Sequence, residues 1–268
     1  TSASILDLSY RLWTGEVSFK DHHPFSINGS FEEVAPGTGF VPSFANVAAF
    51  PTDDGLVLVD TGSSFLAGQV HQSIRTWNGD GLHTAVFTHG HTDHCCGVEL
   101  YEEQARTNGW RAPRVVAHEA IRRRFDRYLE TGGYNGIINQ RQFRLPRPMF
   151  PTEFRYPDDT FTDHLDIMIG DETIECHHDR GETDDHVWLW APRRRVLCTG
   201  DFFIWASPNC GNPQKAQRSA IEWAQALRKM AALDAEVLLP GHGLPILGTD
   251  RIRIALNDSA ALPEHLPT

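Results

Sequence analysis

The sequence of 268 residues has no surplus of positive charge and no long apolar run. Lysine and arginine total 24 against 35 aspartate and glutamate residues, which gives a formal net charge of −11 at pH 7. A nucleic-acid partner requires a clustered basic face, so this balance argues against nucleic-acid binding. The lack of a run of about 18 apolar residues predicts no membrane span. The one basic run, Arg122, Arg123, Arg124 and Arg127, is expected to be a solvated helix face.

Cysteine is scarce, and its spacing is not that of a zinc ribbon. Five cysteines are an odd number in a chain long enough to fold without disulfides, so free thiols are expected. Cys95 and Cys96 follow a histidine cluster, but small thiols are common in cores, and a core role is favoured over metal ligation. Free thiols slightly favour the cytoplasm, although the compartment stays open. The chain begins at Thr1 without a leader, which indicates that any targeting segment is absent or removed.

No linker or low-complexity segment divides the chain, so residues 1–268 are expected to form a single α/β domain. Residues 44–50 and 56–60 are apolar runs separated by the turn signal "PTDDG", which predicts a hairpin of buried strands. Val70, Ile74 and Trp77 are spaced i, i+4 and i+7 and predict an amphipathic helix after Gly68. The first half therefore combines strands with helices.

Further strands and helices follow in the second half. A helix is expected over about 119–129, and Ser219 with Glu222 forms a capping-box pattern ahead of a helix over 220–233. Further strands are predicted within residues 84–90, 115–117, 172–178, 186–192, 194–201 and 235–243. Two sets of strands, each followed by helices, predict two sheets that face each other with helices outside.

The stretch "FTHGHTDHCCG", residues 87–97, gathers four side chains of metal-binding type within six positions. In an extended segment side chains alternate, so His89 and His91 can point to one side and bind one ion. Asp93 and His94 lie where the loop is expected to turn and can face a second ion. Incidental polar residues rarely show such a density at a strand end, and the pattern favours a metal site.

The motif "HGHTDH" resembles the H-x-H-x-D-H signature of the metallo-β-lactamase fold superfamily. Three further marks resemble that superfamily in the same order: Asp60 in "LVDTG", Asp201 in "CTGD" and His242 in "PGHG". The resemblance implies an αββα sandwich of two mixed sheets flanked by helices, with a two-metal site at one edge between the sheets. It also implies that Asp201 bridges the two ions, whereas Asp60 is expected to orient the ligand loops.

The chain departs from the superfamily pattern at Glu182, since "RGETDDH" stands where a third histidine is usual. His177, His178 and His186 are alternative ligands, but Glu182 fits the loop position best. A glutamate here resembles the alkylsulfatase branch, as does "NCGNPQKAQR" at 209–218. That branch usually carries a second glutamate where this chain has Asp201, and it extends into further C-terminal domains.

The expected ligands are His89, His91 and Glu182 for a first ion, Asp93, His94 and His242 for a second, and Asp201 for both. Asp93 and Asp201 are also the candidate catalytic residues. Two divalent ions can share a hydroxide and lower the pKa of water from 15.7 to about 7, which predicts hydrolysis of an ester-type substrate, including a sulfate ester. Zinc is favoured, while the carboxylates also suit iron or manganese. The alternative function is therefore a diiron oxygenase or oxygen-binding protein, and a non-enzymatic metal module is least favoured.

A small anionic substrate requires cationic groups outside the metal ligands, because three carboxylates and a hydroxide cancel the charge of two divalent ions. The candidate substrate-binding residues are Arg141, Lys215 and Arg218, with Asn209 and Asn212 as hydrogen-bond donors. Candidate apolar pocket residues are Phe143, Phe202, Phe203 and Trp205. The sequence leaves the substrate, the native metal and the oligomeric state open, including a homo-oligomer.

Overall fold

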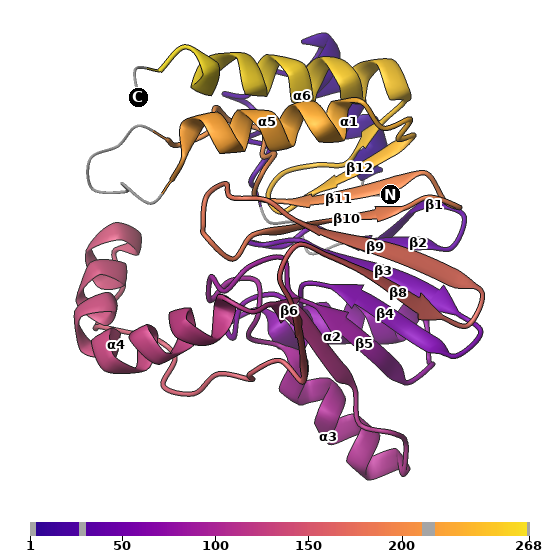
Figure 1. Cartoon of the computed structure of the whole chain (residues 1–268), viewed down its shortest axis with the longest axis vertical. Helices are drawn as coiled ribbons and strands as arrows, with labels where there is room; N and C mark the ends of the chain where they lie inside the picture. The colour runs from indigo at the N-terminus through magenta and orange to yellow at the C-terminus, as the bar shows by residue number, and fades with distance from the viewer. Residues whose placement is uncertain (1–3, 27–30, 211–217, 267–268) are drawn as a thin grey trace.

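The structure is a computed structural model that describes residues 4–26, 31–210 and 218–266. Two β-sheets pack face to face, and helices cover their outer faces (Figure 1). Both sheets are mixed, since each contains parallel and antiparallel pairs. This arrangement confirms the predicted αββα sandwich of two mixed sheets flanked by helices.

The first sheet takes its strands from the N-terminal part of the chain. In spatial order they are β1 (Glu32–Ala35), β2 (Thr38–Val41), β3 (Val47–Thr52), β4 (Gly55–Val59), β5 (Leu82–Val86), β6 (Arg114–His118) and β7 (Asp159–Phe161). The β3–β4 pair is antiparallel, with Ala48 opposite Val59 and Thr52 opposite Gly55, which confirms the predicted hairpin. From β4 to β7 the strands are parallel, so their carboxyl ends lie at one edge.

The second sheet takes its strands from the C-terminal part. In spatial order they are β13 (Ile246–Leu247), β12 (Val237–Pro240), β11 (Val196–Gly200), β10 (Val187–Ala191), β9 (Glu172–His178) and β8 (His164–Ile169). Only β11 and β12 are parallel to each other. Their carboxyl ends therefore reach the same edge, and each is followed by one of the motifs singled out in the sequence.

Helices complete the outer layers. The helices are α1 (Ile5–Thr14), α2 (Ala67–Trp77), α3 (Val98–Asn108), α4 (Ile121–Phe143), α5 (Ala220–Ala231) and α6 (Thr249–Glu264). In Figure 1, α5 and α6 lie over the second sheet, α2 and α3 lie below the first, and α4 stands at the side. Within the described ranges, none of these helices has the length and apolar character required to cross a membrane.

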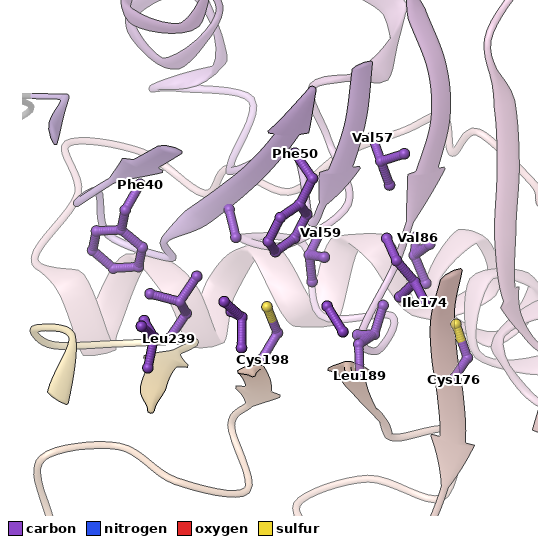
Figure 2. Packing of buried hydrophobic residues seen from close by; sticks show 14 of the residues in the cluster. Phe40, Phe50, Val57, Val59, Val86, Ile174, Cys176, Leu189, Cys198 and Leu239 are labelled. Carbon is purple, nitrogen blue, oxygen red and sulfur yellow. The ribbon is translucent and has the colours of Figure 1, made fainter. Parts of the chain in front are cut away.

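The central core fills the space between the two sheets. Phe50 and Val59 from the first sheet face Ile174 and Leu189 from the second, and all four side chains are buried (Figure 2). Burial of such side chains stabilises the fold by about 1.5–3 kcal/mol each. Cys198 belongs to the same cluster, so its thiol acts as a small apolar group. This interface fixes how the edges of the two sheets meet.

Three local expectations are corrected by the structure. The helix expected over 119–129 continues to Phe143 as α4. Arg124, assigned to a solvated helix face, is buried and donates from Nε to Asp185 Oδ1 at 3.0 Å, whereas its neighbours in the basic run are exposed. The capping box before α5 is not formed, since Ser219 makes no side-chain hydrogen bond at the cap and Glu222 Oε2 lies 3.5 Å from Arg180 Nη1.

Candidate metal centre

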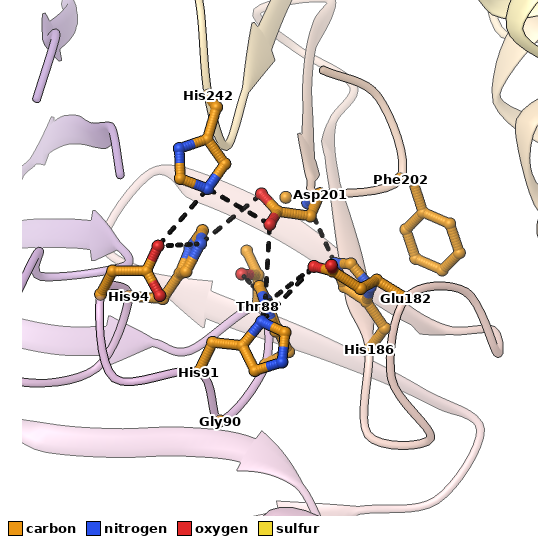
Figure 3. Close-up of polar contacts among 12 residues, drawn as sticks. Thr88, Gly90, His91, His94, Glu182, His186, Asp201, Phe202 and His242 are labelled. Carbon is orange, nitrogen blue, oxygen red and sulfur yellow. Dashed lines mark hydrogen bonds and ion pairs between the residues drawn. The ribbon is translucent and has the colours of Figure 1, made fainter. Parts of the chain in front are cut away.

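The predicted ligand motifs meet at one edge of the sandwich. The histidine-rich loop follows β5 in the first sheet, and three further segments come from the second sheet. Those segments carry Glu182 between β9 and β10, Asp201 after β11 and His242 after β12. Because the preceding parallel strands end at the same edge, side chains far apart in the sequence come together (Figure 3).

One group of side chains contains His89, His91, Glu182 and Asp201, whose donor atoms all lie within 4.8 Å of one another. His89 Nε2 is 2.9 Å from His91 Nδ1. Glu182 Oε2 lies 3.4 Å from His91 Nδ1 and 3.8 Å from His89 Nε2. Two nitrogens and two carboxylate oxygens at these separations match the donor set that zinc, iron or manganese accepts.

A second group contains Asp93, His94 and His242. Asp93 Oδ2 lies 3.7 Å from His94 Nε2 and 3.4 Å from His242 Nε2. Asp201 lies between the groups: its Oδ1 is 3.5 Å from His94 Nε2, while its Oδ2 is 3.3 Å from His242 Nε2 and 3.8 Å from His89 Nε2. The bridging position expected for this aspartate is therefore geometrically open to it.

The donor set passes a test of fit for divalent ions. His94 Nε2, Glu182 Oε2 and Asp201 Oδ1 are buried and have no hydrogen-bond partner. A buried polar atom without a partner costs about 1–3 kcal/mol, and more when it belongs to a charged group. All three atoms face the interior of the two groups, where a cation would satisfy them together. The residues present therefore fit a pair of divalent ions.

Electrostatics in the two groups favour positive charge beside Asp201. Burial lowers the pKa of His242, but Asp201 outweighs it and raises that pKa to about 9. Burial likewise opposes protonation of His94, yet Asp201, Asp60 and Asp93 together hold its pKa well above its usual range. Burial raises the pKa of Asp201, whereas His242 and His94 bring it well below its usual range. The two histidines are therefore stabilised in their protonated form by the same negative charge that would attract metal cations.

Asp60 lies behind the second group, in the orienting position expected from the sequence. Its Oδ2 accepts a hydrogen bond from His94 Nδ1 at 2.7 Å, and its Oδ1 accepts one from the backbone N–H of Thr88 at 2.7 Å. A proton held on Nδ1 leaves Nε2 of His94 free to bind a metal. Asp60 adopts a positive φ of 60°, a strained conformation for aspartate that the surrounding hydrogen bonds maintain.

Asp185 and His186 support the centre in ways that the sequence did not reveal. Asp185 Oδ2 accepts from the backbone N–H of Gly90 at 2.8 Å and so fixes the loop between His89 and His91. A Cβ at Gly90 would lie 2.7 Å from Arg124 Cδ and 2.9 Å from an atom of Ile121, so the close packing requires glycine here. His186 Nε2 accepts from the backbone N–H of Asp201 at 3.1 Å, and burial lowers the pKa of His186 to about 3. The acidic run "ETDDH" was the only sequence signal.

Two of the alternative ligands, His177 and His178, have partners away from the two groups, whereas the ring of His186 lies 4.4 Å from that of His89. His177 Nε2 is 3.2 Å from Glu175 Oε2, and His178 uses its Nδ1 to donate to the carbonyl of His186 at 2.9 Å. Within the described ranges neither joins a metal-binding group, and the same holds for His186. Glu182 lies in one group with His89, His91 and Asp201, and its role as a ligand stays a prediction.

The described cysteines are free thiols, as expected, and none belongs to either group. Cys95 is buried in the cluster under the first sheet, while Cys96 is half-buried and packs against it. Cys95 Sγ donates to the carbonyl of His91 at 3.2 Å. The preference for a core role over ligation therefore agrees with the geometry.

The candidate substrate residues differ in their exposure to solvent. The side chain of Arg218 is largely buried and donates to Glu182 Oε1 and, at 2.9 Å, to the carbonyl of Asn209. The side chain of Asn209 is exposed, as is Arg141 in the last turn of α4. Lys215 and Asn212 lie outside the described residues.

Two of the four aromatic pocket candidates belong to the core. Phe202 and Phe203 are buried, and Phe202 stacks on His186 at 4.2 Å, so its expected pocket role is corrected. Phe203, together with Trp205, lines a cavity of about 280 Å³. Trp205 is half-buried and its Nε1 donates to the carbonyl of Leu244 at 2.7 Å. Phe143, by contrast, is exposed.

An apolar wall beside the centre consists of Phe25, Phe44 and Phe143, of which the sequence pointed only to the last. The ring centroids of Phe25 and Phe44 lie 5.9 and 5.5 Å from that of His242. The ring of Phe143 meets Phe44 edge-on at 5.9 Å, so α4 reaches the same wall. Phe25 and Phe44 gave no sequence signal, because their loops approach His242 only in the folded chain.

An αββα sandwich with adjacent histidine and carboxylate groups at its edge is typical of one class of metal-binding proteins. The family model of the metallo-beta-lactamase superfamily matches residues 38–242, and this chain belongs to that superfamily. Its relatives include a linear primary-alkylsulfatase from Pseudomonas sp. (strain ATCC 19151), 26% identical over 230 residues, which cover 76% of this chain and 42% of the relative. A probable metallo-hydrolase from Bacillus subtilis (strain 168) is 25% identical over 245 residues, covering 82% of this chain and 89% of that protein.

Solved structures show the same fold. The inverting sec-alkylsulfatase Pisa1 from Pseudomonas sp. superposes with a TM-score of 0.75 at 21% identity, covering 88% of this chain and 42% of Pisa1. A metallo-beta-lactamase from Pontibacter korlensis gives a TM-score of 0.62 at 19% identity, covering 88% of this chain and 99% of that protein. This chain thus spans less than half the length of the alkylsulfatases. The named relatives confirm the expected hydrolase class at the level of the superfamily.

Proposed function

We propose that this protein is a hydrolase that uses two divalent ions to cleave an ester bond in a small anionic substrate. The observation that carries the proposal is the pair of donor groups that share Asp201, with buried donor atoms that have no other partner. In this proposal the first ion is held by His89, His91 and Glu182, the second by Asp93, His94 and His242, and Asp201 contacts both.

When bound, the two ions supply a lowered pKa for water and polarise the ester oxygen. The chain's own residues orient the reaction. Asp93 is half-buried, and its carboxylate can accept a proton from the attacking water as general base. Asp201 is positioned by the hydrogen bond from its backbone N–H to His186, which keeps its carboxylate between the two groups. The buried Asp60 fixes the ring of His94 during turnover.

The substrate we propose joins an anionic ester head to an apolar group, with a sulfate ester as the favoured case. The wall of Phe25, Phe44 and Phe143 supports an apolar group next to His242. Arg141, exposed on the last turn of α4 near Phe143, and Asn209 are the proposed contacts for the anionic head. The names of two relatives, a linear primary-alkylsulfatase and a sec-alkylsulfatase, support sulfate as the leaving group.

The test combines metal analysis with a substrate panel. Wild type, His91→Ala and the control His177→Ala are compared by elemental analysis and by turnover of alkyl sulfates, alkyl phosphates and lactones. Loss of His91 removes a neutral nitrogen ligand, so we expect loss of at least one ion and a fall in kcat/KM of at least 100-fold. His177→Ala should retain both ions and the wild-type rate, because His177 pairs with Glu175 on the second sheet.

Full metal content and turnover in His91→Ala would remove His91 from the ligand set and contradict the proposal. Hydrolysis of lactones alone would retain the metal centre but reject the anionic substrate. Arg141→Met adds a second readout, since loss of a contact with the anionic head should raise KM more than it lowers kcat.

One observation favours a second candidate function, a diiron oxygenase. Glu182, Asp201 and Asp93 give the donor set three carboxylates, and oxygen ligands suit iron better than an all-histidine set does. Iron at two equivalents per chain, with dioxygen consumption and no ester hydrolysis, would establish this candidate in place of the hydrolase.

A further inference from the structure

A buried ion pair joins the third ligand of the first group to the start of α5. The side chain of Arg218 is 7% exposed and that of Glu182 is 14% exposed. Arg218 Nη2 donates to Glu182 Oε1, while Oε2 of the same carboxylate has no hydrogen-bond partner and lies 3.4 Å from His91 Nδ1. Oε1 therefore accepts the hydrogen bond from Arg218, whereas Oε2 is free to bind the proposed ion.

Arg218 is poorly placed to bind a substrate anion, the role expected from the sequence. Its Nη1 donates to the carbonyl of Asn209 at 2.9 Å, its Nη2 is directed to Glu182, and its Nε is buried. These contacts tie the segment after Asp201 to the Glu182 loop. A guanidinium in this position is held inside the protein rather than offered to solvent.

The opposite charges of Glu182 and Arg218 explain why each is tolerated in this buried position. A buried charge whose partner is removed is strongly unfavourable, whereas the complete pair is tolerated. The carboxylate and the guanidinium sum to zero, which is also the charge of a neutral imidazole. Without Arg218, the glutamate would lower the net charge of the centre by one unit relative to a histidine ligand, and it could rotate to bind an ion through both oxygens.

We propose that Glu182 and Arg218 act as one unit that replaces a histidine ligand, with Arg218 as the positioning residue. Arg218 restrains the carboxylate so that Oε2 alone faces His89 and His91, and it cancels the carboxylate charge. The centre then keeps the net charge that a histidine would give while offering a hard oxygen ligand. This inference rests on the proposed metal centre.

The test is a double-substitution cycle read out by metal binding. Wild type, Glu182→His, Arg218→Met and the combined variant are titrated with zinc in competition with a chelator, and their bound metal is counted. Glu182→His alone leaves a buried guanidinium beside a dication, so we expect at least tenfold weaker binding of the first ion. Adding Arg218→Met removes that charge and should restore the affinity to within about threefold of wild type.

Arg180→Met in the Glu182→His background is the matched control. Arg180 lies two residues from Glu182, but its partner is Glu222, 3.5 Å away at the surface, so no restoration is expected. If Glu182→His does not fold, the same comparison is made with Glu182→Gln, with and without Arg218→Met, and the same ranking is expected.

The outcomes separate the two proposals. A wild-type protein that binds no divalent ion defeats the proposed function itself. A wild type with two ions, together with a combined variant that binds zinc no better than Glu182→His, retains the function but rejects the unit. Wild-type affinity in Glu182→His alone would also overturn the inference, because it would show that an Arg218 without its carboxylate partner does not weaken binding of the first ion.

Discussion

At the scale of single residues, Asp185 connects the fold to the ligand loop. Burial raises its pKa, but Arg124 together with Thr183, the backbone N–H of Gly90 and His91 outweighs this effect, and the pKa of Asp185 lies below its usual value. Asp185→Asn breaks a buried ion pair, so we expect a loss of about 3 kcal/mol in the free energy of unfolding. Asp184→Asn is the control, because Asp184 pairs with the same arginine from a side chain that is 46% exposed, and less than about 1 kcal/mol should be lost. Urea unfolding of metal-free protein at pH 7 measures both.

The same pair has a defined pH dependence. The folded pKa of Asp185 is depressed, so its stabilisation is present above the unfolded pKa near 3.8 and is lost as the pH falls through the folded value. The difference in unfolding free energy between wild type and Asp185→Asn should be constant from about pH 7 to 5 and shrink below about pH 4. A difference that grows on acidification would contradict this assignment.

Sequence reasoning found the residues whose type and spacing carry chemistry, and it missed those whose role depends on packing. His89 and His91 were predicted from the dense motif "HGHTDH", and Glu182 and Asp201 from the resemblance to the superfamily; their donor atoms lie within 4.8 Å of one another. Arg124 was assigned to solvent by the general rule for arginine, which cannot anticipate two aspartates arriving from 60 residues further along the chain.

At the scale of elements, the N-terminal ends of α1 and α5 both begin after a serine, but only one of these serines forms a capping hydrogen bond. Ser4 caps α1 by accepting a hydrogen bond from the backbone N–H of Leu6 at 3.1 Å, whereas Ser219 makes no such bond at α5. Ser4→Ala should therefore lower the free energy of unfolding by about 1 kcal/mol, and Ser219→Ala by less than about 0.3 kcal/mol. Equal losses in thermal or urea unfolding would show that the capping box forms in solution.

Elements with a strong apolar pattern were predicted well, and those stabilised by tertiary contacts were not. β3, β4, β10 and β11 are buried runs bounded by turn signals, so periodicity and breakers located them. The second half of α4 contains Gly132 and Gly133, which disfavour helix in isolation. It is supported instead by contacts such as Gly136 beside Pro148 and the hydrogen bond from Asn139 to the carbonyl of Met149. β8, whose exposed residues interrupt its apolar pattern, was missed for a similar reason.

At the scale of the whole molecule, the proposed ions stabilise the sandwich by binding the folded state alone. A ligand present at 100 times its Kd raises the free energy of unfolding by about 2.7 kcal/mol. In a protein of this size, a change of 1 kcal/mol in that free energy shifts Tm by about 2–4 °C. Chelation should therefore lower Tm by about 5–10 °C, and added zinc should reverse the shift. A variant with both His91→Ala and His242→Ala should not respond to chelator in a thermal melt; the same shift in that variant would place the stabilising ions elsewhere.

The overall fold was predictable because its four motifs lie in the order that the superfamily shares, from Asp60 to His242. The position of the outer helices relative to the site could not be predicted, because nothing in the local sequence shows that α4 brings Phe143 to Phe44. The apolar wall beside the centre is thus a property of the assembled molecule.

The proposed centre takes ligands for each ion from both sheets, and this has a consequence for the order of events during synthesis. Asp93 and His94 follow a strand of the first sheet, whereas His242 follows a strand of the second and is made 148 residues after His94. A nascent chain that exposes only its first half carries two donors for each proposed ion and lacks Glu182, Asp201 and His242, which complete the two groups. Stable capture of metal must then wait until the second sheet has docked, so the ions that the enzyme acquires are those present where folding finishes rather than where translation begins.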